Sequence, residues 1–230
     1  MFDLQKAIDT AHNITFMTGA GVSTHSGIPD YRSKGGLYAN SADPEYLLSA
    51  ENLRDHPESF YDFVKNRMYY PDAKPNVIHE KMAEISNEKG TIVTQNVDNL
   101  DIKAGAKHVV QFHGTLYKVH CQKCGKQMPW QDYLKDMHHQ TDDGILRPDI
   151  VLYGEGINQQ TLINAVQAVQ SADLIVVVGT SFRVYPFAGL IQYARPDAVL
   201  VAVNKENIAA GDDIHMIQAD ALSVFEKLHA

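Results

Sequence analysis

The sequence predicts an α/β fold: a Rossmann-like, doubly wound parallel sheet with a smaller inserted module. Short apolar runs rich in β-branched residues recur along the chain, and amphipathic helical segments separate several of them. This alternation is typical of a parallel sheet covered by helices on both faces. Two stretches, 33–75 and 114–147, interrupt it. The total of 230 residues suits one large domain that carries a small insertion.

Each expected element follows from its local pattern. The apolar runs that predict strands are Asn13–Thr18, Thr91–Thr94, Val109–Phe112, Asp173–Gly179 and Ala198–Asn204. The segments whose apolar spacing predicts helices are 3–12, 76–88, 158–170, 186–193 and 220–228. The run 173–179 is continuous and β-branched, as expected of a central strand that is buried on both faces.

The two interrupting stretches predict a small domain built from insertions. Residues 33–75 are rich in Tyr, Phe and charged residues without a strand pattern, which indicates helices. Residues 114–147 contain a Cys-pair, zinc-ribbon-like segment, in which Cys121 and Cys124 are three apart; this spacing favours a metal or redox pair over a disulfide framework. The remaining segments 1–32, 76–113 and 148–230 make up the expected Rossmann-like large domain, so that 1–230 is one unit.

The composition excludes several classes of protein. Lys and Arg number 20 against 28 Asp and Glu, and the resulting net charge of −8 argues against a direct nucleic-acid partner while tolerating lysine-rich protein segments. No apolar run reaches the roughly 18–20 residues of a membrane span. Residues 1–21 carry acids and lack the apolar core of a secretory signal. We therefore expect a cytoplasmic protein, with a monomer as the simplest oligomeric state.

A glycine-rich turn, Gly19-Ala20-Gly21, follows the first expected strand. Glycines there let backbone N–H groups approach a phosphate, although a plain tight turn is the alternative. The full dinucleotide fingerprint requires a third glycine at Thr24 and an acid after a second strand, which 36–46 does not provide. The turn thus indicates phosphate binding without an ordinary hydride-transfer dehydrogenase. Tyr31 and Arg32 follow closely, and a ring with a guanidinium suits a dinucleotide, or else a core aromatic and a surface ion pair.

Polar residues also follow the other expected strands. Gln95, Asn96 and Asp98 can hydrogen-bond ribose hydroxyls and a carboxamide, or they can cap the following helix. His113 has the ordinary pKa, about 6.5, of a general base, although a lone histidine is more often structural. Further polar groups follow the last two runs: Gly179, Thr180, Ser181 and Asn204. Since ligands bind at the carboxyl edge of such sheets, these groups predict one extended ligand site.

Taken together, these segments resemble the sirtuin family, the NAD-dependent protein lysine deacylases. The matching segments, in the family's order, are GAGVSTHSGIPDYR (19–32), AKPNVIH (73–79), TQNVDNL (94–100), FHG (112–114), CQKC (121–124), RPDIVLYGE (147–155), GTSFRVYP (179–186) and VN (203–204). Each segment alone is weak evidence. The ordered set covers nearly the whole chain, and other NAD-binding folds do not share it.

The resemblance implies an enzyme of bacterial type that uses NAD as co-substrate. It would release nicotinamide and O-acyl-ADP-ribose and leave free lysine, with no redox change. His113 would be the catalytic base, and Asn96 would hold ribose or water. The residues implied for NAD binding are Ala20, Thr24, Tyr31, Arg32, Gln95, Val97, Asp98, Gly179, Thr180, Ser181, Asn204 and Asp220. Val151, with Gly154 and Glu155, would bind the acyl-lysine protein or peptide as an added strand.

The sequence departs from the family at the metal site. Most relatives hold zinc with two C-x-x-C pairs, whereas this chain has only Cys121 and Cys124. Aligning residues 147–155 places His139 and Asp142 at the second pair, with His138 as a neighbouring candidate. Zinc accepts Cys, His and Asp, so a mixed site is chemically possible. In the alternative, the metal is lost and packing holds the module through Met128, Trp130, Tyr133 and Leu134.

Two further departures concern the reaction. Asp101 stands where relatives commonly have histidine, and the sequence gives no account of its effect. Relatives that prefer succinyl or malonyl groups use a Tyr-x-x-Arg pair, for which this chain offers Tyr61 and Val64. The missing cation favours acetyl or longer apolar acyl groups, although Lys65 and Arg67 lie nearby.

Two other functions remain open from the sequence. An NAD-dependent protein ADP-ribosyltransferase would cleave the same glycosidic bond, but transferase-type relatives often lack the histidine that stands here at position 113. A non-catalytic NAD-sensing module is the other alternative. The combination of Asn96, Asp98 and His113 argues against it.

Overall fold

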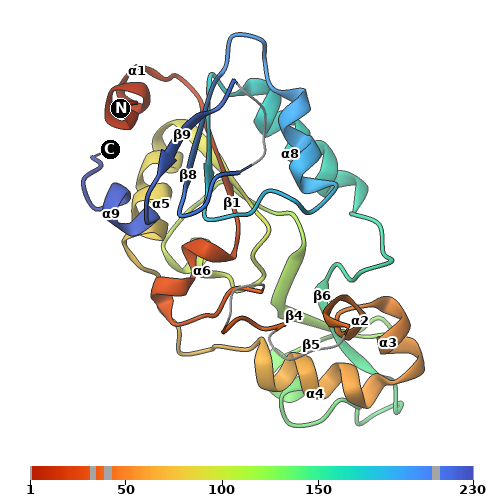
Figure 1. Cartoon of the computed structure of the whole chain (residues 1–230). Helices are drawn as coiled ribbons and strands as arrows, with labels where there is room; N and C mark the ends of the chain where they lie inside the picture. Colours follow the sequence, from red (N-terminus) through yellow and green to blue (C-terminus); the bar gives the residue numbers. More distant parts are fainter. Residues whose placement is uncertain (1, 32–34, 39–42, 209–212, 230) are drawn as a thin grey trace.

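The structure, a computed structural model, describes residues 2–31, 35–38, 43–208 and 213–229. Its larger part is a six-stranded sheet in the order β3-β2-β1-β7-β8-β9, in which every pair is parallel (Figure 1). The strands are β1 (Ile14–Thr18), β2 (Gly90–Thr94), β3 (Val109–Gln111), β7 (Leu174–Val178), β8 (Val199–Asn204) and β9 (His215–Gln218). The predicted α/β class and parallel sheet are confirmed.

The chain order of the strands creates a crevice at the centre of the sheet. From β1 the chain moves outward through β2 and β3, and it later returns to β7 on the other side of β1. The strand order therefore reverses between β1 and β7. In open parallel sheets, ligands bind at the carboxyl ends of the strands next to such a reversal.

Helices cover both faces of this sheet. On one face lie α1 (Leu4–Thr10), α5 (Val77–Lys89) and α9 (Ala221–Phe225), packed on Phe16, Ile92 and their neighbours. On the other lie α8 (Gln159–Ser171) and the 3₁₀ helix η3 (Phe187–Tyr193), packed on Met17 and Val93. Successive strand residues thus serve opposite cores, which is why these strands are apolar throughout.

A second, antiparallel sheet forms a small module beside the first (Figure 1). Its order is β5-β4-β6, and its strands are β4 (Gly114–Cys121), β5 (Gln127–Met128) and β6 (Leu146–Ile150). The helices packed with it are α3 (Ala50–Asp55), α4 (Pro57–Arg67) and α7 (Trp130–Tyr133), and α2 (Pro44–Leu47) packs against α3 and α4. Phe60, Val64 and Tyr133 are buried in its core. The predicted helices within 33–75 are therefore present.

Three local features differ from the expectations. Residues 187–193 form a 3₁₀ helix rather than an α-helix, and α9 ends at Phe225, three residues before the predicted end. The strand β9 was not predicted, because only four residues pair at the edge of the sheet and they are partly exposed. Among the described residues, no helix combines the length and the apolar character needed to cross a membrane.

Candidate active site

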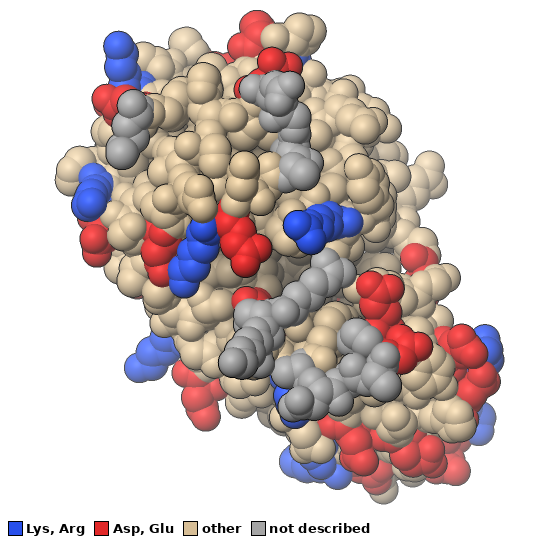
Figure 2. All heavy atoms as spheres, in the orientation of Figure 1, with Lys and Arg blue, Asp and Glu red and all other residues tan. Residues whose placement is uncertain are grey.

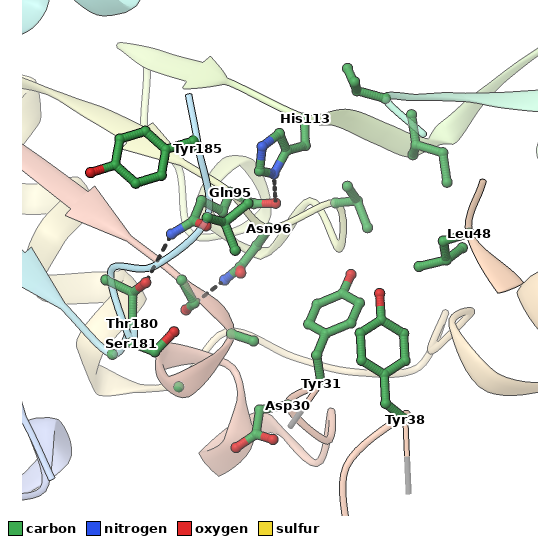
Figure 3. Close-up of a pocket in the computed structure, with 18 of the residues that line it drawn as sticks. Asp30, Tyr31, Tyr38, Leu48, Gln95, Asn96, His113, Thr180, Ser181 and Tyr185 are labelled. Carbon is green, nitrogen blue, oxygen red and sulfur yellow. Dashed lines mark hydrogen bonds between the residues drawn. The ribbon is translucent and has the colours of Figure 1, made fainter. Parts of the chain in front are cut away.

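A cavity of about 720 Å³ lies at the carboxyl edge of the parallel sheet, between this edge and the small module (Figure 3). It brings together polar residues that lie far apart in the sequence. Of the predicted residues, those lining it are Ala20, Thr24, Tyr31, Gln95, Asn96, Val97, His113, Val151, Gly154, Glu155, Gly179, Thr180, Ser181, Asn204 and Asp220. Arg32 lies outside the described residues.

The glycine turn after β1 lies directly against the turn after β7. The Gly21 N–H donates to the Gly179 carbonyl at 2.7 Å, and the Gly19 N–H donates to the Val178 carbonyl. A Cβ on Gly19 would lie 2.6 Å from the Cβ of Thr180, and Gly179 has a φ of +59°. The glycines permit a close approach of these two turns, and the two N–H groups bind backbone carbonyls; phosphate binding by the turn stays a prediction. Two 3₁₀ turns follow, η1 (Ala20–Val22) and η2 (Thr24–Ser26).

The segment after β2 is fixed by a network of side-chain hydrogen bonds. Gln95 Nε2 donates to Thr180 Oγ1 at 2.9 Å, and Asn96 Nδ2 donates to the Gly19 carbonyl at 3.1 Å. Ser23 Oγ donates to Asp98 Oδ2 at 2.7 Å, so the turn after β1 and the segment after β2 are joined. Asp98 lines a smaller cavity of about 20 Å³, which shares Asn96 and Val97 with the main one.

His113 follows β3 and faces the cavity (Figure 3). Its Nδ1 lies 3.3 Å from the carbonyl oxygen of Gln95. Because a carbonyl only accepts, the proton of the neutral ring sits on Nδ1, and Nε2 keeps its lone pair. Burial lowers the pKa of His113, while the hydrogen bond to the Gln95 carbonyl works in the opposite direction. The ring is therefore neutral at pH 7 and can accept a proton at Nε2.

The loop after β6 forms one wall of the cavity. The Val151 N–H donates to the His113 carbonyl at 2.9 Å, which ties the loop to the base. Tyr153 pairs with Ser49 in a parallel bridge that joins the loop to the helical insertion. The Glu155 carboxylate accepts from Arg147 Nη1 at 2.7 Å and from the Leu152 N–H. Glu155 thus holds the loop in shape with the same oxygens that would otherwise contact a substrate.

The opposite end of the cavity carries charged groups. Asn204 ends β8, and Asp220 precedes α9 and accepts from the Leu222 N–H at its start. Asp220 also lies 2.8 Å from His25 Nε2 and 3.0 Å from Lys205 Nζ. These hydrogen-bonding groups line a site of the kind that a sugar and a base would fill.

Sequence reasoning named Tyr31 but missed the rest of the apolar part of the cavity. Tyr31 and Tyr38 lie with their ring centres 5.3 Å apart, and both hydroxyl groups point into the cavity (Figure 3). Burial, together with the charge of Asp98, raises the pKa of the Tyr31 hydroxyl, so it remains protonated. The apolar residues that complete this wall are Leu48, Met68, Ile150, Leu152 and Ile157. They come from four separate segments, so no local pattern marks them.

The predicted acyl-selecting position lies elsewhere. Tyr61 packs edge-on against Tyr133 with ring centres 5.1 Å apart, and Lys65 Nζ lies 3.3 Å from its hydroxyl. Val64 is fully buried in the core of the module. Neither Tyr61 nor Val64 belongs to the described cavity lining.

The four predicted metal ligands lie together in the small module. One donor atom each from Cys121, Cys124, His139 and Asp142 falls within a set of atoms no more than 4.8 Å apart. His138 instead pairs with Asp136 at 3.2 Å and is not part of the set. Both cysteines are free thiols.

The surroundings of the cluster fit a small divalent cation. Hydrogen bonds from the Cys124 thiol and from the Gly144 N–H hold the pKa of Asp142 well below its usual range, so the carboxylate is ionised. A Cβ on Gly144 would lie 2.4 Å from Cys121 Sγ, so only glycine leaves the sulfur its place. Two sulfurs, one imidazole and one carboxylate form a donor set that zinc accepts in tetrahedral geometry.

Comparisons with known proteins agree on one family. The model of the Sir2 family matches residues 19–186. An NAD-dependent protein deacetylase of Lactiplantibacillus plantarum is 52% identical over 96% of this chain and 95% of its own length. One of Listeria monocytogenes is 52% identical over 99% of this chain and 100% of its own. A solved Sir2 complex with a p53 peptide and NAD⁺ has a TM-score of 0.86 at 29% identity, covering 98% of this chain and 97% of that one.

Proposed function

The chain belongs to the Sir2 family, and on that premise we propose that it is an NAD-dependent protein deacetylase. It transfers the acyl group of a modified lysine to ADP-ribose, releasing nicotinamide and O-acyl-ADP-ribose and leaving free lysine. The observation that best supports this function is His113, a half-buried neutral histidine whose Nε2 faces the cavity. Relatives with 52% identity over nearly the whole chain carry the same name.

The residues at the sheet edge suit the two halves of NAD. Gln95 and Asn96 supply amide groups for the nicotinamide ribose, and Val97 with Asp98 lies where a carboxamide can be held. The residues that would hold the remainder of NAD are Ala20, Thr24, Tyr31, Arg32, Gly179, Thr180, Ser181, Asn204 and Asp220. NAD supplies the ribosyl carbon that receives the acyl oxygen when nicotinamide leaves. His113 then removes a proton from a ribose hydroxyl through Nε2.

The substrate peptide would bind along Val151 and Gly154. The backbone of this loop already pairs with Ser49 on one side, and an extended peptide can add to the other by main-chain hydrogen bonds. Glu155 acts through Arg147, holding the loop rather than the peptide. Figure 2 shows acidic side chains gathered on the small module, where Glu51, Asp55, Glu58 and Asp62 are exposed. This surface favours lysine-rich protein segments.

The apolar wall determines which acyl groups fit. Leu48, Met68 and Leu152 offer no positive charge to a succinyl or malonyl carboxylate. Acetyl and longer apolar acyl groups are therefore the expected substrates. Lysine peptides carrying acetyl, butyryl, octanoyl and succinyl groups would test this, with kcat/KM measured for each. Faster turnover of the succinyl peptide than of the butyryl peptide would contradict it.

Zinc is proposed as a structural ion of the small module. Cys121, Cys124, His139 and Asp142 would hold it, well away from the reacting groups, where it would contribute to folding rather than to chemistry. The division into a Rossmann-like large domain and an inserted small domain is proposed on the same basis, with β4 and β6 as the core of the small one. A cytoplasmic monomer without a nucleic-acid partner is the proposed working form.

Replacing His113 by Ala tests the function directly. We expect O-acetyl-ADP-ribose formation to fall about 10²–10⁴-fold, because the reaction loses its base, while the dissociation constant of NAD changes little. Mass spectrometry of an acetyl-lysine peptide, with and without NAD, detects the products. The exposed His108 provides the matched control, and H108A should retain full activity.

Two outcomes would point to other functions. Nicotinamide release by the wild type, with the peptide still acetylated, would favour an ADP-ribosyltransferase. NAD binding without any nicotinamide release would leave a sensing module.

A further inference from the structure

One buried carboxyl group beside the cavity has no role in the reaction described above. Asp101 lies on α6 (Leu100–Lys103), and only 3% of its surface is exposed. Its Oδ1 has no hydrogen-bond partner among the described residues. A buried carboxyl with an unpaired oxygen is costly to retain, so this placement calls for a compensating function.

The other contact of Asp101 leads to the active site. The Thr94 hydroxyl, at the end of β2, forms a hydrogen bond with the Asp101 carboxyl. Thr94 Oγ1 also accepts the Asn96 N–H at 3.0 Å. A hydroxyl has a single proton, so Thr94 donates it to Asp101 while it accepts from Asn96. Without Asp101, the Thr94 side chain would be free to rotate away from the Asn96 N–H.

The backbone held in this way is that of the segment lining the cavity. Asn96 reaches forward to the Gly19 carbonyl at 3.1 Å and to Ser23 Oγ at 3.3 Å. Gln95, its neighbour, carries both the contact to Thr180 and the carbonyl that orients His113. A small rotation of the Asn96 peptide would therefore disturb both the amide contacts and the base.

Asp101 also lies within the electrostatic reach of Asp98. Burial, and then the charge of Asp98, raise the pKa of Asp101 to about 7. Asp98 itself accepts from Ser23 Oγ and from the Leu100 N–H, and it feels the positive charge of Lys103. Burial raises the pKa of Asp98 as well, so a proton kept on Asp101 avoids two adjacent buried charges. Asp101 can then accept from Thr94 without repelling the segment that Thr94 holds.

We propose that Asp101 is a positioning residue for the reaction: through the Thr94 hydroxyl it fixes the backbone of Asn96, and so orients residues 95–98 toward the nicotinamide half of NAD. This inference rests on the proposed function in assigning that half of the cavity to nicotinamide. The coupling itself rests only on the contacts among Asp101, Thr94 and Asn96.

A double-mutant cycle on the full chain tests the coupling. We expect Asp101→Leu to raise the KM for NAD and to lower kcat/KM about tenfold, which corresponds to about 1.4 kcal/mol. Thr94→Val should give a loss of the same size, and the double variant should be no worse than either single one. Asp101→Asn, which still accepts from Thr94, should stay within about threefold of the wild type. Additive losses, or an Asn variant as impaired as the Leu variant, would overturn the proposal.

Two further measurements separate positioning from folding and from the proposed function. Thr91→Val removes a hydroxyl from the same strand, and Glu88→Leu replaces an exposed acid on α5; neither control should change the KM for NAD. Calorimetric titration with NAD applies the same cycle to binding, so it tests the coupling even if the wild type deacetylates no peptide. If kcat/KM falls in proportion to a lowered melting temperature while the affinity for NAD is unchanged, the positioning role is contradicted.

Discussion

The cavity at the sheet edge and the Cys/His/Asp cluster of the small module gather polar groups in opposite ways. In the cavity, each key group has a partner outside the reaction: Gln95 is held by Thr180, Asn96 by the Gly19 carbonyl, and His113 by the Gln95 carbonyl. These partners lie in the turns that directly follow strands of the parallel sheet.

In the cluster, the donors contact mainly one another. His139 Nδ1 lies 2.9 Å from Asp142 Oδ1, and Cys121 Sγ lies 3.5 Å from the same oxygen. They lie at the end of a strand and on loops rather than across a sheet. The comparison teaches that the cavity is preorganised by the fold, whereas the cluster depends on the ion it would bind.

Removal of the metal should therefore have the largest effect on stability. A chelator, or Cys121→Ser, should lower the melting temperature by roughly 8–16 °C. An ion present at a thousandfold excess over its dissociation constant adds about 4 kcal/mol to the free energy of unfolding. In a chain of this size, each kcal/mol shifts the melting temperature by about 2–4 °C. Scanning calorimetry gives the shift, and elemental analysis gives the zinc content, expected at one per chain.

His138 supplies the matched control for this prediction. It is adjacent to a proposed ligand but pairs with Asp136, so His138→Ala should keep the zinc. Purified protein without zinc, together with an unchanged melting temperature for C121S, would mean that apolar packing around Tyr133 holds the module.

Asp101→Asn should have the next largest effect, and it should stabilise the protein. Burial and Asp98 raise the folded-state pKa of Asp101 to about 7, above the unfolded value of 3.8. The unfolded chain then gives up this proton before the folded one does, so stability is lost as the pH rises from about 4 to 7. Removing the acid should restore at most on the order of 4 kcal/mol at pH 8, which sets an upper limit of roughly 8–16 °C on the rise in melting temperature.

The pH dependence makes this prediction specific. The difference between D101N and the wild type should shrink as the pH falls toward 4 and approach zero below about pH 3, where both states of the wild type carry the proton. Melting curves recorded from pH 4 to 8 provide the check. A constant difference at all pH values would show that Asp101 is ionised in the folded protein.

The sequence predicts the parts of the site that obey local rules. Residues Gln95, His113 and Thr180 follow β-branched runs, and parallel strands end at one edge, so their convergence follows from topology. The cysteine spacing likewise predicts a metal loop, and the alignment with the family adds His139 and Asp142; the structure brings donor atoms of all four within 4.8 Å of one another.

What the sequence does not predict depends on contacts between distant segments. The apolar wall combines Leu48, Met68 and Ile150, each of which resembles any other core residue until the fold is known. In the strands β4 and β6, buried positions are interspersed with mostly half-buried ones, and polar residues at these positions hide the strand pattern. Nor does a glycine turn reveal that Gly21 donates to Gly179 rather than to a ligand.

The smallest effect is expected at the charged end of the cavity, where preorganisation is weakest. Although burial acts in the opposite direction, hydrogen bonds from Lys205, the Leu222 N–H and His25 lower the pKa of Asp220 to about 2. The contribution of Asp220 to the free energy of unfolding is therefore present above pH 3.8, the pKa of the unfolded chain, and is lost as the pH falls toward 2.

Asp220→Ala removes both the helix cap and the ion pairs, and should cost about 1 kcal/mol at pH 7. Asp220→Asn keeps an oxygen for the Leu222 N–H and loses only partly exposed ion pairs, so it should cost less than about 1 kcal/mol. Urea unfolding at pH 7 measures both. Equal losses in the two variants would mean that the charge, rather than the cap, is what holds this end of the cavity.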